Sequence, residues 1–171
     1  MYNRISIVGG SGTGKSTLCD ILAKKLNLPA IHLDAINFEA NWVEIDKNKR
    51  DKIINERANE DKWIIDGNYS KTLKERFDRA DLIIWLDYST YAQVKGIFNR
   101  ILKNYGKEKT EIPGCKERFN FTFFKYVITY KVVDSLKAEV TKQITITVIA
   151  DLEPVINAND VYLSIGDTFK E

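Results

Sequence analysis

The sequence has few of the residues that staple small extracellular domains or hold structural metals. It contains two cysteines, Cys19 and Cys115, and a single histidine among 171 residues. Two distant cysteines provide neither a disulfide framework nor the ligand spacing of a structural metal site. We therefore expect the chain to work in a reducing cytoplasm.

Long apolar runs are also missing. No stretch approaches the roughly 18 apolar residues that span a bilayer, and the start MYNRISIVGG lacks the apolar core and cleavage site of a signal peptide. We therefore expect no membrane partner. Hydrophobic and charged fractions of 44% and 29% exclude the disordered and fibrous classes. The length fits one domain, residues 1–171, with one core.

The small net charge of +2 conceals a basic segment. Residues 95–131 contain nine Lys and Arg against three Glu, so this segment carries +6 and the remainder −4. Local positive charge on a nearly neutral chain favours a local anionic ligand over a general nucleic-acid surface. A solvated charged face is the alternative that the composition leaves open.

Short apolar runs rich in β-branched residues alternate with helical patterns. This alternation predicts an α/β protein of three layers, in which a mostly parallel five-stranded sheet has helices on both faces. Ligands of such sheets bind beyond the carboxyl ends of the strands. The predicted strands are 4–8, 30–33, 62–66, 81–87 and 144–150, and the predicted helices are 15–26, 46–60, 71–79, 90–104 and 119–141.

The stretch GGSGTGKST follows the first predicted strand and precedes an amphipathic helix. It fits the pattern G-x-x-x-x-G-K-[ST], in which glycines turn backbone N–H groups into an anion nest. We expect a P-loop NTPase fold in which this loop binds the phosphates of ATP. Lys15 would bridge the β- and γ-phosphates, and the Ser16 hydroxyl would ligate Mg²⁺. A glycine-rich structural turn is the alternative. The predicted loop residues are Gly9, Gly10, Ser11, Gly12, Thr13, Gly14, Lys15, Ser16 and Thr17.

Carboxylates follow three of the predicted strands. Asp66 ends the run WIID, where an oxygen ligand beside the phosphate loop suits Mg²⁺, and a turn cap is the alternative. Asp34 follows the second strand and is a candidate to accept the proton of an attacking hydroxyl or to orient the second substrate. A helix or turn cap is again the alternative. Asp87 ranks third because its strand lies farther from the loop.

Several residues that could be taken for catalytic or binding residues have simpler structural interpretations. His32 alternates with Ile31 and Leu33, which favours a packed or hydrogen-bonded role over catalysis. Cys19 is predicted to be a small buried residue of the first helix. The string NKRD at 48–51 matches a guanine-recognition motif, but it precedes the third strand, so we interpret it as chance. Helical spacing favours core packing over base stacking for six aromatic residues, Phe119, Phe121, Phe123, Phe124, Tyr126 and Tyr130.

Four stretches resemble the topology-modulation protein family, within the P-loop kinases related to adenylate kinase. They are GGSGTGKST, IHLDAINFEANWVE, WIIDGNYSKTLKERFDRADLIIWLD and GCKERFNFTFFKYVITY, and they run from residue 5 to about 130. The resemblance implies a single kinase-like domain with a short lid at about 105–118. It makes Asp34 the acceptor-side carboxylate and Asp66 the metal-side carboxylate.

The same resemblance implies roles for residues outside the phosphate loop. Arg100 matches the arginine that enters the lid, and its guanidinium would clamp the transferring phosphoryl group. Arg76 matches a residue that binds the acceptor, with helix-surface pairing as the alternative. Gly67 and Asn68, in DGNY, are expected on the substrate side.

The chain also departs from the adenylate-kinase pattern. DGNYS stands where adenylate kinases have D-G-F-P-R, the lid is poorer in arginine, and it has no zinc-binding cysteine quartet. The usual monophosphate contacts are therefore not expected, and the acceptor is left unassigned.

These observations favour an ATP-dependent phosphotransferase that uses Mg²⁺ and acts on a nucleotide or another small acceptor. Lys15, Asp34 and Arg100 are its predicted catalytic residues. The alternative is a P-loop ATPase that binds nucleic acid and modulates DNA topology, through the basic segment. A GTPase switch is disfavoured because no guanine motif is properly placed. We expect a monomer or a homodimer.

Overall fold

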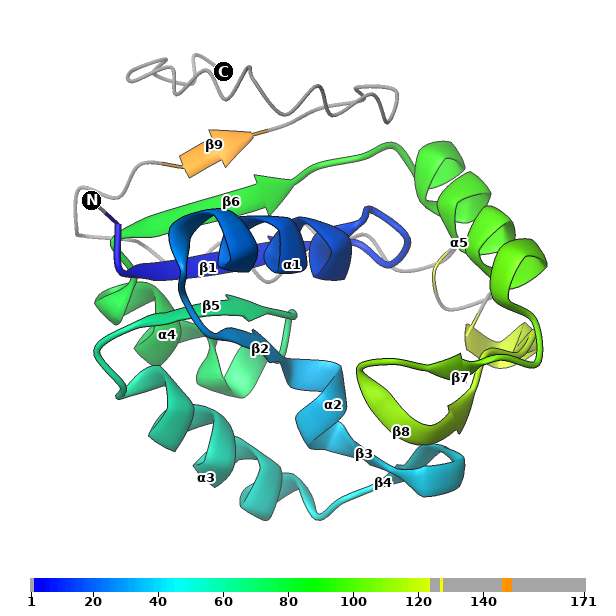
Figure 1. The fold of residues 1–171 in the computed structure, drawn as a ribbon, viewed down its shortest axis with the longest axis horizontal. Helices are drawn as coiled ribbons and strands as arrows, with labels where there is room; N and C mark the ends of the chain where they lie inside the picture. The colour runs from blue at the N-terminus through cyan, green and yellow to red at the C-terminus, as the bar shows by residue number, and fades with distance from the viewer. Residues whose placement is uncertain (1, 124–126, 128–145, 149–171) are drawn as a thin grey trace.

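In the computed structural model, which describes residues 2–123, 127 and 146–148, five parallel strands form one sheet in the order β2-β5-β1-β6-β9 (Figure 1). The prediction of an α/β protein with a mostly parallel five-stranded sheet is confirmed. The strands are β1 (Arg4–Gly9), β2 (Ala30–His32), β5 (Trp63–Asp66), β6 (Leu82–Leu86) and β9 (Ile146–Val148). Of the strand predicted at 144–150, only β9 lies within the described residues.

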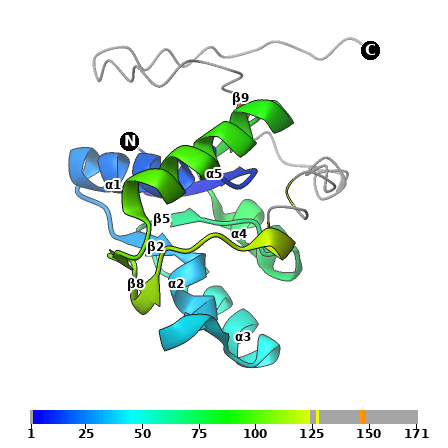
Figure 2. The same ribbon diagram turned by 90° about the vertical axis from the view of Figure 1, so that its right-hand side faces the viewer.

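Helices cover both faces of the sheet because successive strand residues point in opposite directions. Ile5 and Ile7 face α1 (Lys15–Leu26), where they pack with Cys19. Val8 faces the other side, where α3 (Lys47–Ala58) and α4 (Leu73–Arg79) lie, and it packs there with Phe77. Figure 2 shows α1 and α4 on opposite sides of the sheet. The structure therefore has the expected three layers.

The remaining helices lie close to their predicted positions. A short 3₁₀ turn, η2 (Ser70–Thr72), precedes α4, and α5 (Thr90–Asn104) follows β6. The Ser89 hydroxyl caps α5 by accepting from the N–H of Ala92, and Asp46 caps α3. Most of the helix predicted at 119–141 lies outside the described residues. Among the described residues, no helix is long and apolar enough to cross a membrane.

Three small elements were not predicted from the sequence. They are the helix α2 (Leu33–Asn37), a hairpin formed by β3 (Phe38–Glu39), η1 (Ala40–Trp42) and β4 (Val43–Glu44), and a second hairpin formed by β7 (Glu108–Lys109) and β8 (Ile112–Lys116). The β7–β8 hairpin lies within the segment expected to be the lid. It packs against the first hairpin (Figure 1), since the indole Nε1 of Trp42 donates to the Lys116 carbonyl at 2.9 Å. The backbone N–H of Trp42 also donates to the Cys115 sulfur.

The prediction that the aromatic cluster packs in the core is wrong for two of its members. Phe119 is 48% exposed and Phe121 is 71% exposed. Phe123 and Val127, four residues apart, form the face that packs against α5, so Phe121 lies off that face. Phe119 precedes the first helical residue of this segment. Phe124, Tyr126 and Tyr130 lie outside the described residues.

Candidate active site

The phosphate loop connects β1 to α1 at the carboxyl edge of the sheet. Gly14 has a φ of 85° and is the residue before the first turn of α1, a conformation that glycine adopts without strain. The Thr13 hydroxyl and the Lys15 ammonium both donate to the Gly10 carbonyl, at 2.8 and 2.7 Å. The loop therefore curls back on itself and holds the Lys15 amine over its own backbone.

Helix α5 packs directly on this loop through its first two turns. A Cβ at Gly12, where φ is 80°, would lie 2.5 Å from the Gln93 carbonyl oxygen. A Cβ at Gly96 would overlap the Gly12 carbonyl oxygen. Both glycines are therefore needed for backbone contact between loop and helix. Sequence reasoning missed Gly96, although a glycine inside a helical pattern is the usual signal of such a close approach.

Asp66 and Ser16 meet beside the loop. Asp66 ends β5, is buried, and its Oδ2 accepts a 2.7 Å hydrogen bond from the Ser16 hydroxyl. A carboxylate and a hydroxyl are the hard oxygen ligands that Mg²⁺ prefers, and they already lie next to the phosphate loop. The residues present therefore fit the predicted magnesium site.

His32 is joined to the same carboxylate. Its Nδ1 lies 2.9 Å from Oδ1 of Asp66, and its Nε2 lies 3.1 Å from Oδ1 of Asp20. The hydrogen bond with Asp66 raises the pKa of His32 to about 9, against the opposing effect of burial and with help from the Asp66 and Asp20 charges. The predicted hydrogen-bonded role is confirmed. Its partner could not be predicted from the sequence, because it follows from the pairing of His32 with Asp66 in the parallel strands β2 and β5.

The charges of the predicted site converge on Lys15. Burial lowers the pKa of Lys15, the carboxylates of Asp34 and Asp66 oppose this effect, and Arg100 reinforces it. Lys15 begins α1, Asp34 lies in the first turn of α2, Asp66 ends β5 and Arg100 lies in α5. The fold thus places the charges of Asp34, Asp66 and Arg100 close enough to Lys15 to influence its pKa.

Asp34 lies exposed in the first turn of α2. Its Oδ1 accepts a 3.1 Å hydrogen bond from the Tyr69 hydroxyl. Burial and the neighbouring Asp34 charge raise the pKa of Tyr69, so this phenol stays protonated and donates. The Arg50 guanidinium lies 4.7 Å from the centre of the Tyr69 ring. Sequence reasoning did not identify Tyr69 or Arg50, because each lies far from Asp34 along the chain.

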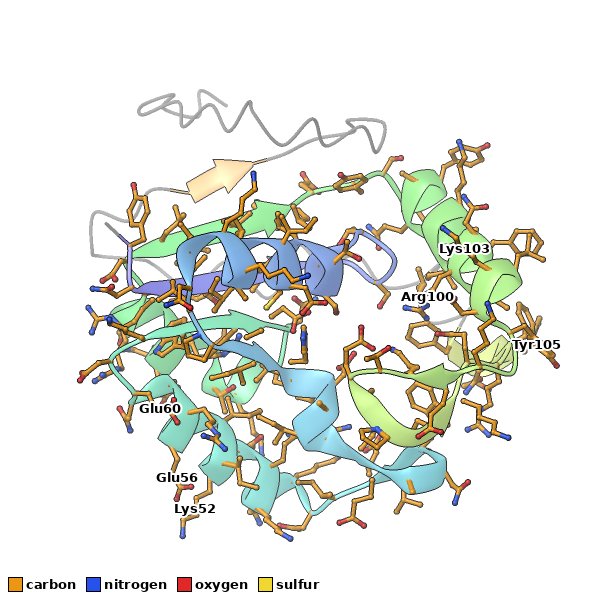
Figure 3. The ribbon with its side chains drawn as sticks, in the orientation of Figure 1. Lys52, Glu56, Glu60, Arg100, Lys103 and Tyr105 are labelled. Atoms are coloured by element: carbon orange, nitrogen blue, oxygen red, sulfur yellow. The ribbon has the colours of Figure 1, made fainter. Side chains whose placement is uncertain are left out.

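Arg100 links α5 to the segment that follows the β7–β8 hairpin. Its Nη2 donates to Oε1 of Glu117 at 3.3 Å, and its Nε lies 3.2 Å from Oε2 of the same carboxylate. Figure 3 shows Arg100 between α5 and this hairpin, whereas Tyr105 lies at the outer edge of the molecule. Glu117 is buried, so the ion pair fixes the guanidinium on the inner side of α5.

Three predicted substrate contacts have hydrogen bonds within the protein. The amide of Asn68 donates to the Gly9 carbonyl at 2.7 Å and accepts from the Gly9 N–H at 3.1 Å. Arg76 is fully buried and donates to the carbonyls of Gly67, Tyr69 and Thr72. These bonds stabilise the phosphate loop and the turn after β5. The acceptor-side role of Gly67, Asn68 and Arg76 stays a prediction.

Two candidates ranked lower in the sequence analysis are Asp87 and the NKRD string. Asp87 is exposed directly after β6, which pairs with β1 through Gly9 and Leu86. The expectation that its strand lies farther from the loop is therefore wrong. The NKRD string forms the first turns of α3, where the Asp51 carboxylate accepts a hydrogen bond from Arg50 at 2.6 Å. Its place on α3 agrees with the interpretation of that string as a chance match.

Comparisons with known proteins bear on the fold. The family described as ATPase family associated with various cellular activities (AAA) matches residues 5–87. A gluconokinase from Sinorhizobium meliloti 1021 has a similar structure, with a TM-score of 0.56 and 16% identity over 89% of this chain and 84% of that chain. A shikimate kinase from Bacteroides thetaiotaomicron gives a TM-score of 0.49 and 19% identity over 75% and 77% of the two chains. No curated protein matches the chain in sequence.

The matched segment runs from β1 to the residue that follows β6, so it includes the phosphate loop and Asp66. With the likeness to the gluconokinase structure, the match supports the three-layer α/β fold expected of a P-loop NTPase. The resemblance to the topology-modulation proteins stays a prediction.

Proposed function

We propose that this protein is an ATP-dependent phosphotransferase that moves the γ-phosphoryl group of ATP to a small acceptor. The main support for the proposal is the geometry of the phosphate loop, where Lys15 donates to the Gly10 carbonyl and Ser16 donates to the buried Asp66 carboxylate at 2.7 Å. Asp34 and Arg100 lie close enough to influence the pKa of Lys15. A phosphate-binding turn alone would not require these further charged groups. The likeness to the gluconokinase structure supports the proposal through the fold.

Each residue has a role in positioning and charge neutralisation, which dominate phosphoryl transfer. The loop N–H groups and the start of α1 would bind the phosphates, and Lys15 would move from the Gly10 carbonyl to the β- and γ-phosphates. Ser16 and Asp66 would hold Mg²⁺, which supplies positive charge to the phosphate oxygens. Arg100 would neutralise the charge that develops on the transferring group.

Asp34 would orient the acceptor and take its proton. Its exposed position in α2 leaves it accessible, and the Tyr69 hydroxyl fixes the carboxylate. A hydroxyl-bearing acceptor fits this site better than a nucleoside monophosphate. The negative charge of Asp34 would repel the phosphate of a monophosphate. The Arg76 guanidinium already donates to backbone carbonyls, and the Arg50 guanidinium is paired with Asp51 at 2.6 Å.

The test is ADP release from Mg-ATP across two panels, one of small hydroxy acids and sugars and one of nucleoside monophosphates. We expect acceptor-stimulated release with a member of the first panel and its loss in Lys15→Ala. Lys24→Ala, an exposed change on the same helix, is the matched control and should retain the activity. Release that no acceptor stimulates, and that Lys15→Ala leaves unchanged, would contradict the proposal.

The alternative of nucleic-acid binding depends on the basic segment 95–131. Two of its described lysines already have contacts within the protein, since Lys107 donates to the Lys103 carbonyl at 3.0 Å and Lys109 lies 5.4 Å from the Trp42 ring centre. Gel shifts at two salt concentrations distinguish the functions. The kinase account predicts no binding that falls steeply with salt, whereas the alternative predicts it.

A further inference from the structure

Cys19, His32 and Asp66 form a compact group of metal-ligating side chains on the α1 side of the sheet. They come from α1, β2 and the end of β5, and their ligand atoms all lie within 4.8 Å of one another. Cys19 is fully buried, Asp66 is 4% exposed, and the His32 side chain is 15% exposed. One sulfur, one nitrogen and one oxygen ligand therefore face one another in a place that is largely shielded from solvent.

This set of ligands differs in kind from the magnesium ligands. Sulfur and imidazole nitrogen are ligands of Zn²⁺ and related late divalent metals, whereas Mg²⁺ takes oxygen ligands. The two oxygens of Asp66 also face different partners. Its Oδ2 accepts from Ser16, whereas its Oδ1 lies 2.9 Å from Nδ1 of His32.

The neighbours of His32 and Asp66 would orient these two side chains as metal ligands. Nε2 of His32 lies 3.1 Å from Oδ1 of Asp20, so an imidazole that coordinates through Nδ1 would donate its other N–H to a carboxylate. This carboxylate–histidine–metal arrangement orients histidine ligands in known metal sites. Ser16 likewise donates a hydrogen bond to the Asp66 carboxylate. The Cys19 thiol donates to the Ile64 carbonyl at 3.5 Å, a hydrogen bond that metal binding would replace.

We propose that Cys19, His32 and Asp66 bind a thiophilic divalent cation such as Zn²⁺ or Co²⁺ beside the phosphate loop. The three side chains supply three ligands and leave a fourth position for water. Binding replaces the hydrogen bond between His32 and Asp66, and it releases the Cys19 thiol proton and the Nδ1 proton to solvent.

The proposed metal site does not depend on the proposed kinase function. Only the effect of the metal on phosphoryl transfer rests on that function. If Asp66 also serves Mg²⁺, occupancy by Zn²⁺ would inhibit phosphoryl transfer. If the protein binds the metal but has no kinase activity, the proposed metal site is still supported. Kinase activity without metal binding would leave the proposed function intact.

The test is a titration of the full chain with Co²⁺ in the absence of nucleotide, followed by near-ultraviolet absorption. A thiolate ligand gives a sulfur-to-cobalt charge-transfer band, which oxygen and nitrogen ligands do not give. We expect the band to saturate at one equivalent in the unmodified protein and to disappear in Cys19→Ser. Cys115→Ser is the matched control, because Cys115 is also buried but lies in the β7–β8 hairpin. It should retain the band.

Asp20→Ala keeps the test decisive if Cys19→Ser does not fold. The Asp20 side chain is 55% exposed, so its loss leaves the core intact. We expect the Co²⁺ affinity to fall about 10- to 100-fold, since outer partners of histidine ligands have effects of this size. Absence of the band in both the unmodified protein and Cys115→Ser would overturn the proposal. Unchanged Co²⁺ affinity in Asp20→Ala would also overturn it.

Discussion

The hydroxyl of Ser16 donates a 2.7 Å hydrogen bond to Asp66 and so joins the first turn of α1 to the end of β5. The same carboxylate receives His32 on its other oxygen. The Asp66 side chain therefore connects the phosphate loop, through Ser16, to strand β2, through His32. Most of the expected consequences of mutation follow from this connection and from the charges around Lys15.

Asp66→Asn preserves the size of the side chain and removes its charge. We expect kcat for phosphoryl transfer to fall by about 10²–10³-fold, as for the loss of a group that stabilises charge in the transition state. The Mg²⁺ concentration needed for half-maximal activity should rise. Steady-state kinetics over a Mg²⁺ series measures both effects, with Asp61→Asn, an exposed change in the turn before β5, as the control. Equal Mg²⁺ dependence in Asp66→Asn and the unmodified protein would exclude Asp66 as a metal ligand.

The pKa of His32 predicts how stability depends on pH. Its pKa is about 9 in the folded chain and 6.5 in the unfolded chain, so the folded state binds the proton more tightly. The stabilisation is fully present below pH 6.5 and is lost as the pH rises through 9. We expect its size to be on the order of 2 kcal/mol. Urea unfolding of the unmodified protein and His32→Gln between pH 6 and 9.5 checks this. A gap between the two proteins that does not narrow with pH would contradict it.

Arg100→Lys keeps the positive charge beside Glu117 but loses the planar guanidinium. We expect kcat to fall by about 10²-fold while the dissociation constant of ATP changes little, because a lysine clamps a phosphoryl group less specifically. Kinetics and equilibrium ATP binding separate the two effects. Lys103→Ala, an exposed change on the same helix, serves as the control. An equal loss in both variants would show that Arg100 acts only through the charge of the segment.

Asn68→Ala removes both hydrogen bonds between the side chain of Asn68 and the backbone of Gly9. We expect a loss of stability of about 1–3 kcal/mol, since the Gly9 groups lose their partners in a partly buried place. ATP affinity should also fall, because the loop begins at Gly9. Chemical denaturation and ATP binding measure these changes, and the exposed change Ser70→Ala is the control. A protein of normal stability with weakened acceptor binding would contradict this structural role and support the substrate-side role predicted from the sequence.

Trp42→Phe tests the contact between the two hairpins. The change removes the 2.9 Å hydrogen bond from Nε1 to Lys116 and retains an aromatic ring against Phe38, which lies 5.3 Å away between ring centres. We expect faster hydrogen exchange in the β7–β8 hairpin and a higher KM for the acceptor. Exchange in β1 should not change. Val43→Ala, at an exposed neighbour, is the control. Unaltered exchange in β7–β8 would show that Trp42 does not hold the hairpin.

The sheet, the helices and the phosphate loop were predictable from the sequence because they depend on local patterns. The β-branched runs and the glycine-rich turn before Lys15 need no knowledge of distant contacts. The hairpins were missed because three of their four strands, β3, β4 and β7, have only 2 residues each. Their stability comes from pairing across the fold, such as Trp42 with Lys116, and not from a periodic pattern.

The candidate site was predictable in part, for the same physical reason. Residues at strand ends, such as Asp66, were identified because parallel strands end at one edge. The hydrogen bonds of Asn68 and Arg76 with the backbone could not be predicted, since sequence alone does not show which polar groups pair within the fold. Tyr69, Arg50 and Glu117 were missed, because each meets its partner only through tertiary packing.

The most direct test of the central claim is the fate of the γ-phosphoryl group of labelled ATP, in the presence of Mg²⁺ and the acceptor that best stimulates ADP release. The account predicts that label appears in the acceptor with the unmodified protein and with Lys24→Ala, and is lost with Lys15→Ala. Label found only in inorganic phosphate, at a rate that no acceptor alters, would contradict it.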